Sequence, residues 1–304
     1  MLSFKRCLIA AVALIAARQA HSQTVDDSIP PGANFDKAQF RLWTPRTNEK
    51  LRALLVLVPG SNGDGRAMAE DTVWQAFATK NKLAIIACRF TDKPHDQGYI
   101  EDYVNVSRGS GQALLDAIGH FATQTGHAEL SSAPLLLWGM SAGGQFNYEF
   151  VAWKPDRVLA FIVNKGGIYY SALLPHASRN VPGLLFVGGK DLEFRTNTIA
   201  GLFAVNRRAG ALWALAEEPG AAHVVGRSRD MALLFFEDVL PLRLSDPPAP
   251  LRPILESSGF LGDLKTKTVQ KQRGAAPNYP TAWLPTARVA RAWEALGTER
   301  PFEP

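Results

Sequence analysis

The chain has 304 residues, of which 46% are hydrophobic and 20% charged, and it contains 25 glycines, 20 prolines and two cysteines. This composition excludes a disordered, collagen-like or disulfide-rich protein and is typical of one large globular domain or two ordinary ones. The 33 Lys and Arg residues outnumber the 28 Asp and Glu residues, but they are scattered. Without a run of basic residues, no nucleic-acid partner is predicted.

The first 22 residues have the pattern of a secretory signal peptide. Lys5 and Arg6 form a positive start, an eleven-residue apolar run extends from Cys7 to Ala17, and small residues precede a cleavage point near Ser22. A membrane anchor is less favoured, because the run is shorter than the roughly 20 residues that span a bilayer. We therefore expect a secreted or periplasmic protein without a stable membrane anchor. Cleavage leaves 30 basic and 28 acidic residues, a net charge of +2.

Six short apolar runs, bounded by Gly, Pro or Asn, predict buried strands. Their unbroken apolar character is typical of strands that are covered on both faces of a sheet. Segments with helical spacing lie between them, as where Leu114, Leu115, Ile118 and Phe121 share one face. The predicted strands are 51–58, 83–90, 133–139, 159–163, 183–187 and 211–215, and the predicted helices are 66–80, 111–125, 145–153, 196–208 and 228–240.

This alternation of strands and helices predicts an α/β domain with a mainly parallel central sheet and helices on both faces. In residues 23–50 an alternating stretch around Phe40 and Leu42 favours an antiparallel hairpin at the edge of that sheet. Cys88 lies inside the second predicted strand, so we expect its side chain to be buried.

The same pattern divides the chain into three parts. Residues 1–22 are the predicted signal peptide, residues 23–245 the α/β domain, and residues 246–304 a C-terminal extension packed on the same domain. In the extension, prolines replace the alternation, and one short helix is predicted around residues 287–296.

The third predicted strand leads into Gly139-Met140-Ser141-Ala142-Gly143, which has the form G-x-S-x-G. This sharp turn between a strand and a helix needs small residues beside the serine, and it exposes the hydroxyl at the carboxyl end of the sheet. An ordinary Gly-rich turn is the alternative, but the strand before the motif and the helix after it favour a functional site. Ser141 is the predicted nucleophile.

A serine hydroxyl needs a base that takes its proton and an acid that orients the base. After this type of turn the acid comes next in the chain and the histidine last. His176 and His223 both follow Ser141, and His223 also follows the last predicted strand, so His223 is the predicted base. Asp191 comes just after the strand 183–187 and is the predicted acid, with Glu193 or Glu217 as alternatives.

The tetrahedral intermediate of acyl transfer needs two backbone N–H donors for its oxyanion. Ala142, directly after the nucleophile, is one predicted donor. The Gly-rich loop 59–65 is expected to supply the other, with Ser61 favoured over Asn62. A phosphate-binding loop is not predicted here, because no Gly-Lys-Ser/Thr follows.

The segment 164–181 is longer than the usual connection of about 4–6 residues and predicts a wall of the binding pocket. Tyr169 and Tyr170 either face substrate there or pack the segment onto the domain. With Asn62 they are the predicted substrate-binding residues. No H-E-x-x-H motif or Cys/His cluster occurs, so no metal is predicted.

Together these motifs resemble the α/β-hydrolase superfamily, and within it the secreted polyhydroxybutyrate depolymerases and feruloyl esterases. The resemblance covers residues 53–240 and rests on the serine turn with Gly144, the Pro-Gly-Ser-Asn loop, the segment 188–191 and His223. Relatives usually carry His-Gly where this chain has Pro59-Gly60. The resemblance implies an α/β-hydrolase fold with residues 23–245 as the catalytic domain. It also implies a serine esterase that forms an acyl-enzyme with a small-molecule or polymeric ester and needs no cofactor. A serine peptidase or amidase, or a non-catalytic extracellular binding protein, are the alternatives.

Overall fold

A computed structural model describes residues 22–47, 49–96, 100–245, 250–272 and 280–302. Apart from Ser22, the predicted signal peptide lies outside this part of the chain. Within the described ranges, no helix has both the length and the apolar character that a membrane span requires.

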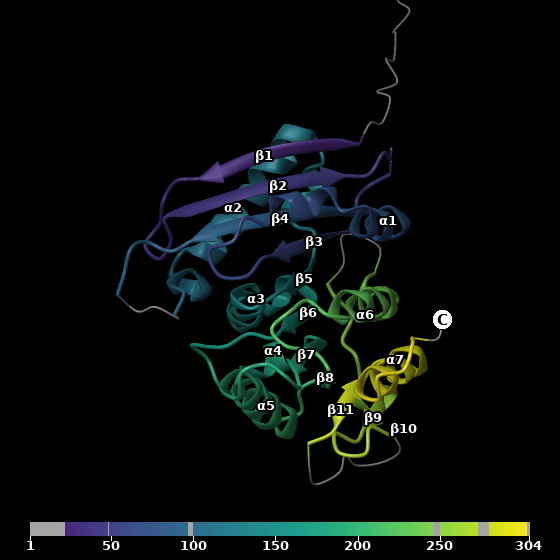
Figure 1. Cartoon of the computed structure of the whole chain (residues 1–304). Helices are drawn as coiled ribbons and strands as arrows, with labels where there is room; N and C mark the ends of the chain where they lie inside the picture. Colours follow the sequence, from purple (N-terminus) through teal and green to yellow (C-terminus); the bar gives the residue numbers. More distant parts are fainter. Residues whose placement is uncertain (1–21, 48, 97–99, 246–249, 273–279, 303–304) are drawn as a thin grey trace, which may run out of the picture.

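The centre of the molecule is an eight-stranded sheet with the strand order β1-β2-β4-β3-β5-β6-β7-β8 (Figure 1). The hairpin β1–β2 and the pair β2–β4 are antiparallel, and all other neighbouring strands are parallel. The predicted mainly parallel sheet and the antiparallel hairpin at its edge are therefore confirmed. The strands are β1 (Gln23–Ile29), β2 (Lys37–Thr44), β3 (Ala53–Val58), β4 (Leu83–Thr91), β5 (Leu135–Gly139), β6 (Val158–Asn164), β7 (Gly183–Gly188) and β8 (Trp213–Glu218).

Helices cover both faces of this sheet, with α2, α3 and α5 on one face and α1 and α6 on the other (Figure 1). In β3, Leu54 and Val56 join the apolar cluster of the first face, and Leu55 and Leu57 that of the second, because successive strand residues point to opposite faces. The helices are α1 (Thr72–Asn81), α2 (Ser110–Thr125), α3 (Ala142–Trp153), α4 (His176–Arg179), α5 (Glu193–Arg208), α6 (Ser228–Arg243) and α7 (Ala287–Gly297).

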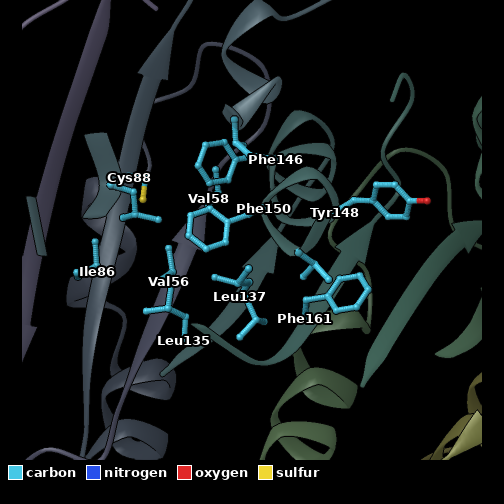
Figure 2. Close-up of a cluster of buried hydrophobic side chains, with 14 of the residues drawn as sticks. Val56, Val58, Ile86, Cys88, Leu135, Leu137, Phe146, Tyr148, Phe150 and Phe161 are labelled. Atoms are coloured by element: carbon cyan, nitrogen blue, oxygen red, sulfur yellow. The ribbon is translucent and has the colours of Figure 1, made fainter. Parts of the chain in front are cut away.

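Aromatic side chains hold α3 on the sheet (Figure 2). Phe146 stacks on Phe90 of β4 with a centroid distance of 5.1 Å, and on Phe150, one turn further along α3, at 6.0 Å. Cys88 lies in the same cluster with a free, buried thiol, as expected. Because α3 begins directly after Ser141, this cluster also fixes the position of the serine turn.

The C-terminal residues form more structure than the sequence predicts. The predicted helix is present as α7, but β9 (Phe260–Gly262), β10 (Val269–Lys271) and β11 (Ala282–Leu284) also form a second, antiparallel sheet. The Trp293 indole N–H of α7 donates to the main-chain oxygen of Leu215 at 2.7 Å, so this region covers β8. Strands of three residues are too short for their side-chain alternation to be recognised in the sequence.

Candidate active site

The turn between β5 and α3 holds Ser141 in a strained backbone conformation. Its φ of 54° and ψ of −122° lie in a region that residues with a side chain rarely adopt. The Ser141 N–H donates to the main-chain oxygen of Asn164 at the end of β6, at 2.8 Å. Ala142 then begins α3, so the Ser141 hydroxyl lies at the positive N-terminal end of a helix.

Two glycines allow this turn to form. A Cβ atom on Gly139 would lie 2.2 Å from the main-chain oxygen of Gly143, and a Cβ atom on Gly143 would lie 2.2 Å from the main-chain oxygen of Val58. Backbone therefore packs directly on backbone on both sides of Ser141, which is the physical reason for the Gly-x-Ser-x-Gly sequence.

Gly143→Ala is expected to lower the free energy of unfolding by about 3 kcal/mol, because a methyl group has no space beside Val58. Urea denaturation would measure the change. Gly201→Ala in α5 is the matched control: apart from its chain neighbours and the backbone of its own helix, no described atom lies within 4 Å of its Cβ position. This control should raise stability by about 0.5–1 kcal/mol, since alanine favours a helix interior over glycine. A Gly143→Ala protein as stable as the control would contradict the close packing.

The loops after β7 and β8 bring Asp191 and His223 to Ser141. The Nε2 atom of His223 lies 3.0 Å from the Ser141 Oγ, and its Nδ1 atom lies 2.8 Å from the Asp191 Oδ2. Ser141 and His223 are 82 positions apart in the chain. The three predicted residues thus form one line of hydrogen bonds that runs from a buried carboxylate to a hydroxyl.

The two glutamates named as alternative acids have other partners. Glu217 accepts a hydrogen bond from Lys267 at 2.8 Å, and Glu193 accepts one from Asn197 at 3.4 Å. The geometry therefore favours Asp191 as the carboxylate that orients the histidine.

The Asp191 carboxylate is almost completely buried, with 2% of its side chain exposed, and both oxygens are hydrogen-bonded. Its Oδ1 accepts from the Leu192 N–H at 2.7 Å and from Arg195 at 3.2 Å. Burial raises the pKa of Asp191, but the hydrogen bonds from His223, Leu192 and Arg195 outweigh it and lower the pKa overall. The carboxylate therefore stabilises the folded state above about pH 4, and this contribution is lost as the pH falls through the folded pKa.

The loop after β3 approaches the serine closely, since a Cβ atom on Gly60 would lie 3.6 Å from the Ser141 Cβ. Among the described residues, the main-chain N–H groups of Ser61 and Ala142 have no hydrogen-bond acceptor. The Asn62 N–H, in contrast, donates to the Tyr103 hydroxyl at 3.3 Å. The hydrogen-bond pattern favours Ser61 over Asn62 as the second oxyanion donor, beside Ala142.

A polar recess of about 350 Å³ lies next to Ser61 and Asn62, with Asp36, Asp92 and Glu101 among its lining residues. The Asn62 side chain braces the recess, because its Oδ1 accepts the Asp92 N–H at 2.7 Å. Within the described part of the chain, no three His, Cys, Asp or Glu side chains are placed to hold a metal ion.

The two predicted binding tyrosines have different environments. The Tyr169 ring packs edge-on against Tyr148 with a centroid distance of 5.0 Å, and its buried hydroxyl has no hydrogen-bond partner among the described residues. Burial raises the pKa of Tyr169 well above its ordinary value. Tyr170 is 43% exposed, and its hydroxyl donates to the main-chain oxygen of Glu101 in the wall of the recess, at 3.4 Å. Tyr169 packs the segment onto the domain, whereas Tyr170 is accessible to a ligand.

Comparison with solved structures identifies the fold. Poly(3-hydroxybutyrate) depolymerase from Bordetella parapertussis aligns with 75% of this chain and 93% of its own, with a TM-score of 0.55 and 16% identity. The chain has the α/β-hydrolase fold. Poly(aspartic acid) hydrolase-1 from Sphingomonas sp. KT-1 aligns with 69% of this chain and 97% of its own, with a TM-score of 0.50 and 16% identity. S-formylglutathione hydrolase from Staphylococcus aureus aligns with 73% of this chain and 98% of its own, with a TM-score of 0.50 and 13% identity.

The expected α/β-hydrolase fold is therefore confirmed. No family model and no curated protein sequence matches the chain. At 13% and 16% identity the solved structures establish the fold alone, so the chemistry of this chain rests on its own side chains.

Within this α/β-hydrolase fold, Glu149 of α3 anchors the segment 164–181, which contains Tyr169 and Tyr170. Its buried carboxylate accepts from the Tyr170 N–H at 2.8 Å, and from the N–H and hydroxyl of Ser171 at 2.9 and 2.8 Å. Burial raises the pKa of Glu149 by more than these hydrogen bonds lower it. A raised folded pKa contributes stability below the unfolded pKa, and that stability is lost as the pH rises through the folded pKa.

Glu149→Gln is therefore expected to unfold with less dependence on pH and to be more stable than the wild type at neutral pH. The amide keeps the shape of the carboxyl group and can still accept the two N–H groups. Urea denaturation at several pH values between about 4 and 8 would test this. Stability curves that run parallel for the two proteins would contradict it.

The sequence patterns did not predict one buried charged group beside the candidate site. Lys165 has no exposed surface, and its ammonium lies 3.1 Å from Glu218 and 3.3 Å from the Asn164 side-chain oxygen. Lys165 and Glu218 are 53 positions apart in the chain. In the sequence, a buried lysine at the end of an apolar run cannot be distinguished from a surface lysine. No sequence pattern therefore predicts the contact between Lys165 and Glu218.

Proposed function

We propose that the chain is a serine hydrolase of carboxylic esters that acts through an acyl-enzyme. The observation that carries this proposal is the line of hydrogen bonds from Ser141 Oγ to His223 (3.0 Å) and from His223 to Asp191 (2.8 Å). This order of hydroxyl, imidazole and buried carboxylate activates a serine for attack on a carbonyl carbon. Structural neighbours named as depolymerase, hydrolase and esterase support an ester hydrolase.

In the first half-reaction the Ser141 oxygen attacks the ester carbonyl carbon while His223 Nε2 takes the hydroxyl proton. Asp191 accepts the Nδ1–H hydrogen bond and stabilises the imidazolium that forms. The N–H groups of Ser61 and Ala142 donate to the developing oxyanion. When the tetrahedral intermediate collapses, the C–O bond to the alcohol breaks, and the departing alkoxide takes its proton from His223. The acyl group remains on Ser141.

In the second half-reaction water replaces the alcohol. His223 takes a proton from the water as its oxygen attacks the acyl carbon, and the same N–H donors hold the second oxyanion. Collapse breaks the bond to Ser141, and His223 returns the proton to the Ser141 oxygen. The carboxylic acid leaves, and the enzyme regains its first state without a cofactor.

The proposed substrate is a small-molecule or polymeric ester. The recess beside Ser61 and the exposed Tyr170 ring are the proposed substrate contacts, and Asn62 supports them through its bond to Asp92. We also propose that the enzyme acts outside the cytoplasm, secreted or periplasmic, after cleavage near Ser22, because its first residues have the pattern of an export signal.

Activity across a panel of substrates tests this function. The panel comprises nitrophenyl esters of increasing acyl length, hydroxycinnamate esters, polyester films and aminoacyl anilides, each with Ser141→Ala as the blank. Turnover of esters well above that of anilides supports the proposal, and the reverse supports a peptidase or amidase. A folded protein that turns over neither and does not react with a fluorophosphonate at Ser141 would be a binding protein, contrary to the proposal.

A further inference from the structure

The buried ion pair between Lys165 and Glu218 lies at the end of the sheet where the loops with Asp191 and His223 begin. Lys165 follows β6 directly, and Glu218 is the last residue of β8. The Lys165 side chain is fully buried, and that of Glu218 is 6% exposed. A Cβ atom on Gly188, at the end of β7, would lie 3.0 Å from the Lys165 Cε, so the lysine passes directly beneath the start of the Asp191 loop.

Glu218 holds the segment that follows His223. Its Oε2 accepts the Arg227 N–H at 3.1 Å, and its main-chain oxygen accepts the Gly189 N–H of the Asp191 loop at 2.9 Å. Gly226 has a φ of 58°, and a Cβ atom there would lie 1.9 Å from the Glu218 Oε2. The segment therefore lies directly on the carboxylate, with no side chain between them.

Asn164 is the second hydrogen-bond partner of Lys165, and it holds the same segment. Its side-chain N–H donates to the main-chain oxygen of Val225 at 3.3 Å, and its side-chain oxygen accepts from Lys165 at 3.3 Å. The main-chain oxygen of Asn164 accepts the Ser141 N–H at 2.8 Å. One end of β6 thus contacts both the serine turn and the chain just after His223.

The buried ion pair between Lys165 and Glu218 is expected to contribute little to the stability of the fold. Burial lowers the pKa of Lys165, and the Glu218 and Asp191 carboxylates oppose that shift. The desolvation of two buried charges offsets most of their attraction, so a buried ion pair contributes little net stability compared with an apolar pair of the same volume. The bonds of Glu218 to Gly189 and Arg227, and of Asn164 to Val225, point instead to a geometric role for Lys165 and its two partners.

We infer that Lys165 is a positioning residue: through Glu218 and Asn164 it holds the segment 221–227 so that the His223 imidazole stays within hydrogen-bonding distance of both Ser141 and Asp191. This inference rests on the proposed function. It assigns Lys165 no contact with substrate and no proton transfer.

Lys165→Met and Glu218→Gln test the inference, with Lys267→Met as the matched control. Lys267 also has a positive φ, 58° against 54° for Lys165, and it pairs at 2.8 Å with Glu217, the neighbour of Glu218. Glu217 points to the other side of β8, since successive strand residues alternate. The control therefore breaks a neighbouring, more exposed ion pair, which among the described residues makes no hydrogen bond to the segment 221–227. Glu218→Gln keeps the size of the side chain, so it tests the same inference if Lys165→Met does not fold.

Two measurements apply to each variant. Steady-state kinetics on a nitrophenyl ester should show kcat reduced on the order of 100-fold with KM changed less than about two-fold, because a misplacement near 1 Å has such an effect on the chemical step. Proton NMR should show loss of the strongly downfield resonance of the His223 Nδ1–H, which reports the bond to Asp191 without any substrate. The control should keep both the kcat and the resonance of the wild type.

The outcomes separate this inference from the proposed function. Folded Lys165→Met or Glu218→Gln proteins with wild-type kcat and an unchanged resonance would overturn the inference. A parallel loss in Lys267→Met would also overturn it, since the effect would then follow from breaking any ion pair on β8. If the wild type hydrolyses no ester, the proposed function fails, while the resonance still shows whether Lys165 positions His223.

Discussion

Ser141→Ala is expected to lower kcat for ester hydrolysis on the order of 10⁶-fold, because without the hydroxyl no acyl-enzyme can form and the histidine has no proton to take. KM should change little, since the oxyanion donors and the recess beside Ser61 are untouched. Initial rates on a short-chain nitrophenyl ester, measured with protein of verified fold, would give the ratio. Esterase activity that survives this substitution would exclude Ser141 as the nucleophile.

Substitutions of Ser141 should also change the free energy of unfolding, independently of their effect on activity. Alanine keeps the backbone strain that φ of 54° and ψ of −122° impose on Ser141, whereas glycine relieves it. Ser141→Gly is therefore expected to be more stable than Ser141→Ala by about 1 kcal/mol. Both variants lack the hydroxyl and should be equally inactive. Equal free energies of unfolding in urea would show that the turn is unstrained.

Asp191→Asn is expected to lower kcat on the order of 10⁴-fold with the geometry of the site preserved. An amide at this position can donate an N–H to His223 Nδ1. That hydrogen bond favours the tautomer with its proton on Nε2, which cannot accept the Ser141 proton. The carboxylate that stabilises the imidazolium is also lost. Comparison of kcat with the rate of fluorophosphonate labelling of Ser141 would show whether both fall together, as activation by His223 requires.

The two glutamates near the site provide the controls for Asp191. Glu193→Gln and Glu217→Gln should each leave kcat within about two-fold of the wild type, because these exposed or half-buried side chains contact Asn197 and Lys267 instead of His223. A loss in either variant comparable to that of Asp191→Asn would assign the orienting acid to that glutamate.

Most of the central sheet could be predicted because its signal is local. Each strand from β3 to β8 contains a short apolar run, and the structure buries these runs between two layers of helices. Element ends were less predictable. The predicted helix from residue 66 begins as α1 only at Thr72, because Arg66–Glu70 is a 3-10 helix and the Asp71 carboxylate caps the N–H groups of Val73 and Trp74.

The candidate site was predictable to different degrees. The serine turn has a steric signature in consecutive residues, and the order of motifs along an α/β-hydrolase chain singles out His223. Several carboxylates follow strand ends, so the chain order by itself left Asp191, Glu193 and Glu217 as candidates. Ser61 and Asn62 likewise occupy one loop with similar backbone freedom.

By itself, the sequence determined the strand–helix alternation, the strained turn at Ser141 and the histidine that follows the last strand, because periodicity and local sterics act between residues close in the chain. The tertiary structure decided which carboxylate faces His223, which amide of the loop after β3 stays free, and how Lys165 meets Glu218. Those outcomes depend on contacts between residues 32 to 82 positions apart, and only the packing of the sheet and its helices brings such residues together.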